Sequence, residues 1–256
     1  MTTLPGNTVK TADYPGYVLL TGAGGGIGLG VVDHFLRSGV RKIACQYRSR
    51  YAALADLFKS HGLEPEEHCF QAELTDEPQV RELRVRVNQR FGEVWGLVNL
   101  AGGSTNQLSW KMPKDEFLQV ISQNLLSTFL CIREFTPDLR GRQGGRVINV
   151  TSVVAFSGAA GAAHYCAAKA GIVGLTRAVA IELAPKNVSV NALALGYFDQ
   201  GLIQQVPANL QEELKARTPL RRFGRVNEVA AAIEYLLGEG AGFVTGQVLH
   251  INGGLL

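Results

Sequence analysis

A tyrosine and a lysine four residues apart are the side chains of this sequence best suited to proton transfer. Tyr165 and Lys169 stand at positions i and i+4, so on a helix they share one face, one turn apart. A phenol with a pKa of about 10 is a poor acid or base at neutral pH, but a neighbouring ammonium stabilises the phenolate and lowers that pKa. The pair could then exchange a proton with a carbonyl or alcohol oxygen. The same spacing also occurs on solvated helix faces, so this interpretation needs support from elsewhere in the chain.

Two further features supply that support. Ser152 stands at the end of the fifth strand that the apolar pattern predicts. Near the start of the chain, the first strand is followed by Thr21-Gly22-Ala23-Gly24-Gly25-Gly26-Ile27-Gly28 and then by a helical segment. Glycine tolerates positive φ and has no Cβ to block an anion, and the free amides of a helix N-terminus attract phosphate. A flexible turn is the alternative, but the position between a first strand and a first helix favours a cradle for dinucleotide phosphates.

Short apolar runs alternate with segments of helical periodicity along the chain, which predicts buried parallel strands joined by helices. The expected helices include Gly28-Arg37, Glu77-Phe91 and Ala167-Leu183. The expected strands are Tyr17-Leu20, Lys42-Gln46, His68-Ala72, Gly96-Asn99, Arg146-Val150, Ser189-Leu193 and Val248-Ile251. We therefore expect an α/β fold, a single-domain Rossmann-type doubly wound parallel sheet of about seven strands. Residues 1–16 are expected to form a flexible lead-in, and residues 17–256 the dinucleotide-binding and catalytic domain, with a substrate lid near residues 198–225.

The composition excludes several other classes of protein. The chain has 256 residues, 46% of them hydrophobic and 18% charged, which supports a large core and excludes a disordered chain. A net charge of +3 is too small to indicate nucleic-acid binding. We expect no membrane span, because no stretch of about 18 apolar residues occurs. The four cysteines show no metal-ligand spacing, so we expect no metal site and a cytoplasmic protein with reduced thiols.

The end of the second strand indicates which dinucleotide is preferred. A carboxylate at this point binds the ribose hydroxyl of NAD, whereas an arginine accommodates the 2′-phosphate of NADP. The sequence here is Tyr47-Arg48-Ser49-Arg50, with two arginines and no acid. NADP(H) is therefore favoured, with Arg48 as the phosphate contact and Ser49 as a hydrogen-bond donor, and NAD(H) is left open. An exposed loop arginine is the alternative interpretation of Arg48.

Taken together, these motifs resemble the short-chain dehydrogenase/reductase family. The resemblance runs from about Tyr17 to the C-terminus and rests on Thr21-Gly22-x3-Gly26-x-Gly28, Asn99-Leu100-Ala101-Gly102, Asn124, Ser152, Tyr165 and Lys169. The ending Thr245-Gly246-Gln247-Val248-Leu249-His250-Ile251-Asn252-Gly253-Gly254 is similar to that of the family's 3-oxoacyl-[acyl-carrier-protein] reductase branch.

The resemblance implies a set of catalytic roles. Tyr165 gives a proton to the carbonyl oxygen of the substrate while the nicotinamide delivers hydride to the carbon. Lys169 holds the nicotinamide ribose and lowers the pKa of the tyrosine, and Ser152 orients the carbonyl oxygen. Asn124, expected within a helix over Glu116-Phe135, anchors a water that connects Lys169 to solvent.

The resemblance also implies which residues bind the cofactor. The expected set is Thr21, Gly22, Gly26, Ile27, Gly28, Tyr47, Arg48, Ser49, Glu73, Leu74, Asn99, Ala101, Gly102, Tyr165, Lys169 and Gly196. Within this set Gly102 is expected to provide backbone clearance. The sequence departs from the usual family pattern at several positions, which are Gly25, Leu100, Glu73, Leu195-Gly196 and Gln200.

Three functions are compatible with these residues. The first is an NADP-dependent reductase of a ketone, with a 3-oxoacyl thioester as the leading substrate and acyl carrier protein as a possible partner through the basic residues of Lys215-Arg225. The second is a dehydrogenase of another secondary alcohol, sugar or steroid, and the third a nucleotide-sensing protein without turnover. The family is usually dimeric or tetrameric, so a homo-oligomer is expected. His164 is interpreted as a loop histidine rather than a residue that faces substrate.

Overall fold

The computed structural model describes residues 14–142 and 144–256. Most of the lead-in expected over residues 1–16 lies outside these ranges. The strands are β1 (Tyr17–Thr21), β2 (Ile43–Tyr47), β3 (Cys69–Gln71), β4 (Val94–Asn99), β5 (Gly145–Ser152), β6 (Val188–Leu195) and β7 (Val248–Ile251). The α-helices are α1 (Gly26–Arg37), α2 (Ala52–Ser60), α3 (Pro65–His68), α4 (Glu77–Phe91), α5 (Lys114–Ile121), α6 (Ser127–Gly141), α7 (Val154–Ser157), α8 (Ala163–Leu183), α9 (Ala208–Arg217) and α10 (Val226–Leu237).

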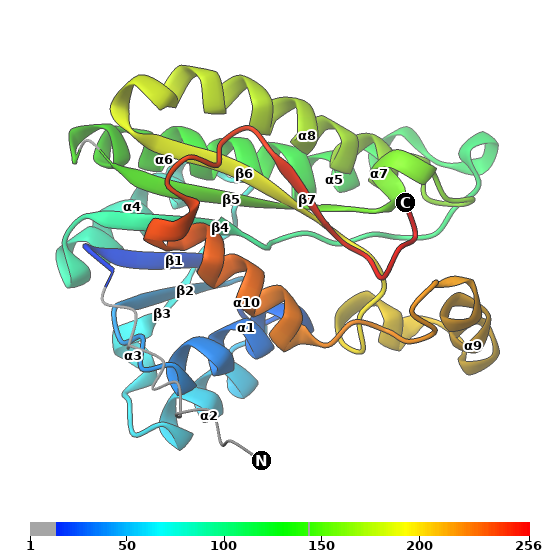
Figure 1. The fold of residues 1–256 in the computed structure, drawn as a ribbon, viewed down its shortest axis with the longest axis horizontal. Coiled ribbons are helices and arrows are strands. Elements are labelled where there is room, and N and C mark those ends of the chain that lie inside the picture. Colours follow the sequence, from blue (N-terminus) through cyan, green and yellow to red (C-terminus); the bar gives the residue numbers. More distant parts are fainter. Residues whose placement is uncertain (1–13, 143) are drawn as a thin grey trace, which may run out of the picture.

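All seven strands join one parallel sheet in the order β3-β2-β1-β4-β5-β6-β7 (Figure 1). This confirms the predicted α/β fold with a doubly wound parallel sheet. The chain reverses its direction of winding between β1 and β4, where Thr21 pairs with Asn99. The carboxyl ends of β1 and β4 therefore diverge into separate loops, and such a switch point is where open parallel sheets bind ligands.

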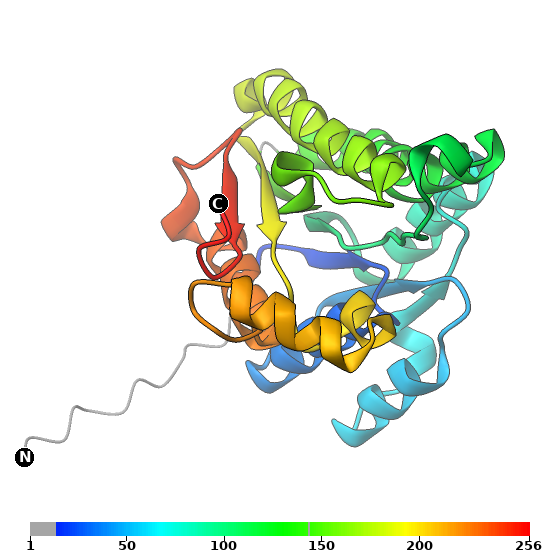
Figure 2. The same cartoon turned by 90° about the vertical axis from the view of Figure 1, so that its right-hand side faces the viewer.

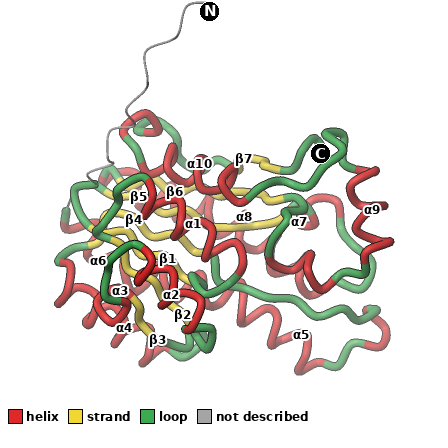
Figure 3. The backbone as a smooth tube through the Cα atoms, turned by 90° about the horizontal axis from the view of Figure 1, so that it is seen from below, coloured by secondary structure: helices red, strands yellow, loops and turns green. Residues whose placement is uncertain are grey.

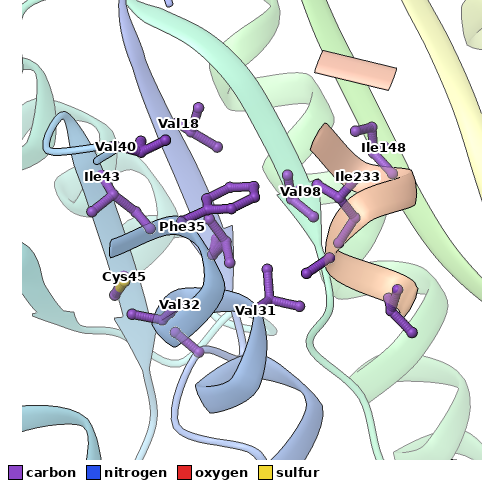
Figure 4. Packing of buried hydrophobic residues seen from close by; sticks show 14 of the residues in the cluster. Val18, Val31, Val32, Phe35, Val40, Ile43, Cys45, Val98, Ile148 and Ile233 are labelled. Atoms are coloured by element: carbon purple, nitrogen blue, oxygen red, sulfur yellow. The ribbon is translucent and has the colours of Figure 1, made fainter. Parts of the chain in front are cut away.

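Helices cover both faces of the sheet, and each face has its own hydrophobic core. Alternate residues of β1 serve the two cores, because successive side chains of a strand point to opposite faces. Val18 and Leu20 pack against α1, α2 and α10, whereas Tyr17 and Leu19 pack against α4, α6 and α8. Figure 4 shows the first core, in which Phe35 of α1 lies between the sheet and its helix. The two cores hold the sheet rigid, so residues at its carboxyl edge are placed precisely.

The helix expected over Glu116-Phe135 is interrupted in the structure. α5 ends at Ile121, a π-turn follows over Ser122–Leu126, and α6 begins at Ser127. π-turns inside helices often mark functional sites, and this one contains Asn124. The prediction of a continuous helix was wrong at this point, since hydrophobic periodicity does not report a single inserted residue.

The excursion expected near residues 198–225 leaves the sheet after β6. It carries a short 3-10 helix, η4 (Gly201–Gln205), and α9, which stands apart from the sheet in Figure 1. In Figure 2 this segment faces the viewer. A bridge between Phe198 and Gly224 closes its base. No described helix is long and apolar enough to span a bilayer.

Candidate active site

A cavity of about 630 Å³ lies at the carboxyl edge of the sheet. Its wall runs from the glycine-rich turn after β1, past the ends of β2 to β6, to Tyr165 on α8 and the start of the 198–225 excursion. Figure 3 shows α5 and α9 on opposite sides of this end of the molecule. The cavity therefore joins the predicted phosphate cradle to the predicted proton-transfer residues.

The glycine-rich turn is shaped by close backbone contacts. Gly22 has φ +67°, and a Cβ on it would lie 2.7 Å from Cα of Ala101. A Cβ on Gly28 would lie 2.4 Å from the carbonyl oxygen of Gly22, so both positions exclude a side chain. α1 begins at Gly26, with no acidic residue in its first turn and no side-chain hydrogen bond at its N-cap Gly25. Its first amides thus remain available at the cavity wall for an anion such as pyrophosphate.

A residue that sequence reasoning missed holds this turn in place. Gln46 is 2% exposed, and its Oε1 accepts a hydrogen bond from the amide of Gly22 at 2.8 Å. Its Nε2 donates to the carbonyl oxygen of Ala72 at 2.7 Å, so one side chain ties β2 to the ends of β1 and β3. The signal in the sequence is an amide side chain within an otherwise apolar strand, since a buried polar group requires partners.

Two predicted cofactor-binding residues lie behind the cavity wall. Thr21 is 1% exposed, and its Oγ1 accepts hydrogen bonds from the amides of Leu100 and Ala101 at 3.1 and 3.2 Å. Asn99 donates to Oδ1 of Asn149 at 2.9 Å in the interior of the sheet. Both residues support the wall and do not line it. The other members of the predicted set do line it: Gly22, Gly26, Ile27, Gly28, Tyr47, Arg48, Ser49, Glu73, Leu74, Ala101, Gly102, Tyr165, Lys169 and Gly196.

The loop after β2 presents its arginines to the cavity. Nη1 of Arg48 lies 3.7 Å from Oε2 of Glu73, and 60% of the Arg48 side chain is exposed. Gln71 donates to the carbonyl oxygen of Arg48 at 2.8 Å, which fixes the backbone of the loop. Arg50 lines the same part of the cavity. A long, exposed ion pair contributes little stability, so Arg48 can exchange Glu73 for another anion at small cost.

Ser152 and Tyr165 line the cavity side by side, one at the end of β5 and the other in the first turn of α8. Desolvation by burial raises the pKa of Tyr165 to about 12, and the nearby hydroxyl of Ser152 opposes this rise only in part. The phenol is therefore protonated at neutral pH, as a proton donor must be. The expectation that its pKa is lowered is wrong for this structure, because desolvation of the phenol dominates. Lys169 Nζ lies over the ring, 5.5 Å from its centroid.

Lys169 is a buried cation. It is 3% exposed, and its Nζ donates to the carbonyl oxygen of Val150 on β5 at 2.9 Å. Burial lowers the pKa of Lys169 from 10.5 to about 8, because the charged form has left water for a site with few partners. The ammonium keeps donor capacity that this one carbonyl does not use.

Asn124 brings an unpaired acceptor close to that ammonium. The residue is fully buried, its Nδ2 donates to the carbonyl oxygens of Gly103 and Val120, and its Oδ1 has no partner among the described residues. A Cβ on Gly102 would lie 2.3 Å from that Oδ1 and 3.4 Å from Nζ of Lys169. Gly102 thus provides clearance, as expected, and the side chain for which it makes room is that of Asn124. The gap between amide oxygen and ammonium suits a bridging water.

His164 differs from its expected role. It lies in the first turn of α8, has no exposed surface, and is not among the residues that line the cavity. The interpretation as a loop histidine is wrong, because the residue is buried in a helix. Both of its ring nitrogens have polar partners there.

A doubly wound sheet with a glycine-rich turn, and with serine, tyrosine and lysine on the wall of the same cavity, defines an oxidoreductase that uses a nicotinamide dinucleotide on CH–OH or keto groups. The family model described as Enoyl-(Acyl carrier protein) reductase matches residues 22–256. The chain belongs to the short-chain dehydrogenase/reductase family.

Several characterised relatives are similar over nearly the whole chain. The 3-oxoacyl-[acyl-carrier-protein] reductase FabG of Staphylococcus epidermidis is 34% identical over 240 residues, which cover 93% of this chain and 97% of the relative. The protein of the same name from Thermotoga maritima is 35% identical over 239 residues, covering 93% and 96%. Nodulation protein G of Azospirillum brasilense is 35% identical over 237 residues, covering 93% and 96%.

Proposed function

We propose that the protein reduces a ketone to a secondary alcohol with NADPH, and that the substrate is a 3-oxoacyl thioester. The observation that carries the proposal is the placement of Ser152, Tyr165 and Lys169 along one cavity that also contains the glycine-rich turn. Nucleotide sensing requires only the turn. A buried lysine beside a protonated tyrosine is costly to maintain and is useful for proton transfer, which favours an enzyme.

In this proposal the substrate oxygen lies between Ser152 and Tyr165. The hydroxyl of Ser152 donates to the oxygen and orients it, and Oη of Tyr165 supplies the proton as negative charge develops there. When bound, the nicotinamide supplies the hydride. Lys169 would hold its ribose with the donors that Val150 leaves free. A water between Lys169 and Oδ1 of Asn124 returns a proton from solvent.

The lining residues fit a dinucleotide. The first amides of α1 suit the pyrophosphate, and the ends of β2 and β3 suit the adenosine half, with Arg48 and Arg50 placed for a 2′-phosphate. The charged residues that line the cavity are Arg48, Arg50, Glu73 and Lys169. The part lined by Gln119, Gln123, Tyr197 and Leu202 carries no charge, which suits the uncharged keto end of a substrate. Relatives named 3-oxoacyl-[acyl-carrier-protein] reductase support the thioester.

The reaction is tested by following NADPH oxidation by absorbance with acetoacetyl-CoA as substrate. We expect turnover with NADPH, and slower turnover with NADH as the control. If both cofactors bind and neither is oxidised, the 3-oxoacyl substrate is wrong. The same assay run with a panel of ketones, and in reverse with sugars and secondary alcohols, then tests the alternative dehydrogenase.

The preference for NADPH depends on Arg48 in this proposal. Replacement of Arg48 by Ala removes a charge-assisted contact with the 2′-phosphate, so we expect KM for NADPH to rise about tenfold. KM for NADH should not change, because NADH has no phosphate at that position. Initial rates with each cofactor measure both values, with Arg81→Ala on the exposed face of α4 as the matched control. An equal rise for the two cofactors would contradict the assignment of Arg48.

We further propose a homo-oligomer, either dimer or tetramer, that acts in the cytoplasm. Four apolar side chains of the α5–α6 segment are exposed: Phe117, Leu118, Leu126 and Phe129. All four cysteines are free thiols, which suits a reducing compartment. Acyl carrier protein is the proposed acidic partner. In the basic segment Lys215-Arg225, Lys215 and Arg222 form ion pairs with Glu212 and Glu228, which leaves Arg217, Arg221 and Arg225 for such a contact.

A further inference from the structure

A chain of hydrogen bonds runs from the backbone of Tyr165 to a surface carboxylate. The amide of Tyr165 donates to Nδ1 of His164 at 2.9 Å, so the proton of the neutral imidazole is on Nε2. Nε2 then donates to Oγ1 of Thr105 at 2.8 Å, and the Thr105 hydroxyl donates to Oε1 of Glu116. Every donor in the chain meets one acceptor, so its polarity is fixed from end to end.

This chain connects three segments that surround the cavity. His164 is in the first turn of α8, Glu116 is in the first turn of α5, and Thr105 is in the loop between β4 and α5. Gly103, Ser104 and Thr105 of that loop line the cavity. The loop has no regular structure there, so it depends on contacts with its neighbours for a single conformation.

Among the described residues, four hydrogen bonds tie residues 103–107 to neighbouring elements, and the one to Glu116 leads to α5. Asn124 donates to the carbonyl oxygen of Gly103 at 2.8 Å, and the amide of Gln107 donates to the carbonyl oxygen of Gly161, just before α8, at 2.9 Å. His164 holds Thr105, which lies between these two points. Without the imidazole, the cavity wall from Ser104 to Asn106 would be tied to α8 only through the contact at Gly161.

We propose that His164 is a positioning residue, which acts through Thr105 and Glu116 to hold the substrate wall of the cavity at a fixed distance from Tyr165. Only the kinetic tests of this inference, which measure KM and kcat for the ketone, rest on the proposed function. Burial of an imidazole with no exposed surface would be costly if its nitrogens were unpaired. Its Nδ1 accepts from the amide of Tyr165, and its Nε2 contacts Thr105, an exposed residue that the core does not require. The arrangement adds a fixed point in the middle of a loop that has no regular structure.

Two substitutions of His164 separate positioning from packing. The amide of His164→Gln places a donor near the site of Nε2 and can still reach Thr105. The shorter His164→Asn can accept from the Tyr165 amide at the site of Nδ1 but cannot reach Thr105. For His164→Asn we expect KM for the ketone to rise about tenfold with kcat changed less than about threefold, and for His164→Gln values close to those of the unmodified protein. Equal effects of the two substitutions would overturn the proposal.

Thr105→Val removes the hydroxyl that contacts His164 and Glu116. Because Thr105 is exposed, this substitution does not change the packing of the core. It should raise KM as His164→Asn does, and the double variant should be no worse than either single variant, because the two substitutions remove one interaction. Additive effects in the double variant would show that Thr105 and His164 act separately and would overturn the link.

Amide hydrogen exchange tests the link without any turnover. Exchange of the amides over residues 103–108 should be about tenfold faster in His164→Asn and unchanged in His164→Gln. If the protein reduces no ketone, faster exchange in His164→Asn alone would retain the positioning role and reject only the proposed function. Unchanged exchange in both variants would overturn the positioning role, whatever the activity.

Discussion

Tyr165→Phe is expected to lower the turnover number about 10³-fold, because it removes the hydroxyl that we propose as the proton donor. Burial raises the pKa of Tyr165 to about 12, so its phenol carries a proton at neutral pH, and phenylalanine has no such proton to give. Phenylalanine retains the ring over which the ammonium of Lys169 lies. Cofactor affinity should therefore stay within about twofold, as measured by quenching of protein fluorescence on titration with NADPH.

Tyr235→Phe is the matched control for this substitution. Tyr235 lies on α10, about half of its side chain is exposed, and it is not among the residues that line the cavity. It should have normal kcat and KM. Turnover that survives in Tyr165→Phe would show that another group donates the proton and would remove the central residue of the proposed mechanism.

The fold could be predicted from the sequence because parallel strands and their helices follow simple periodicities. The strand expected over Val248-Ile251 and the helix expected over Glu77-Phe91 have the observed bounds. α8, however, begins at Ala163 and not at Ala167. Its first turn contains His164 and Tyr165, which are weak helix formers, so periodicity alone does not extend the helix to them. That turn is held by the tertiary contacts of His164.

The site could be predicted as a set of residue types, but their hydrogen-bond partners could not. Gly22 and Gly28 are recognisable because a turn of this kind requires glycine. The support given by Gln46 to the turn, and the placement of Asn124 in a π-turn beside Lys169, depend on residues that are distant in sequence. The spacing places Lys169 near Tyr165, which led to the expectation of a lowered pKa for Tyr165. It does not show that Tyr165 is buried, and burial raises that pKa.

Lys169→Met is expected to abolish most activity and yet to stabilise the fold. The fall in the pKa of Lys169 from 10.5 to about 8 means that burial of the ammonium costs roughly 3 kcal/mol at neutral pH. Methionine has a similar shape without the charge, but it leaves the carbonyl oxygen of Val150 without its donor, which costs about 1 kcal/mol. We expect kcat to fall more than about 100-fold and Tm at pH 7 to rise by about 5 °C, measured by calorimetry.

The dependence on pH identifies the cause of that stabilisation. Below pH 8 the lysine is protonated in both the folded and the unfolded protein, so the full cost of the buried charge is present. Between pH 8 and 10.5 the folded protein releases the proton first, and the cost declines as pH rises. The difference in Tm between Lys169→Met and the unmodified protein should therefore be smaller at pH 9.5 than at pH 7. Lys59→Met, at an exposed position on α2, should show no such difference. A Tm for Lys169→Met below that of the unmodified protein would mean that Lys169 contributes to the stability of the fold as well as to catalysis.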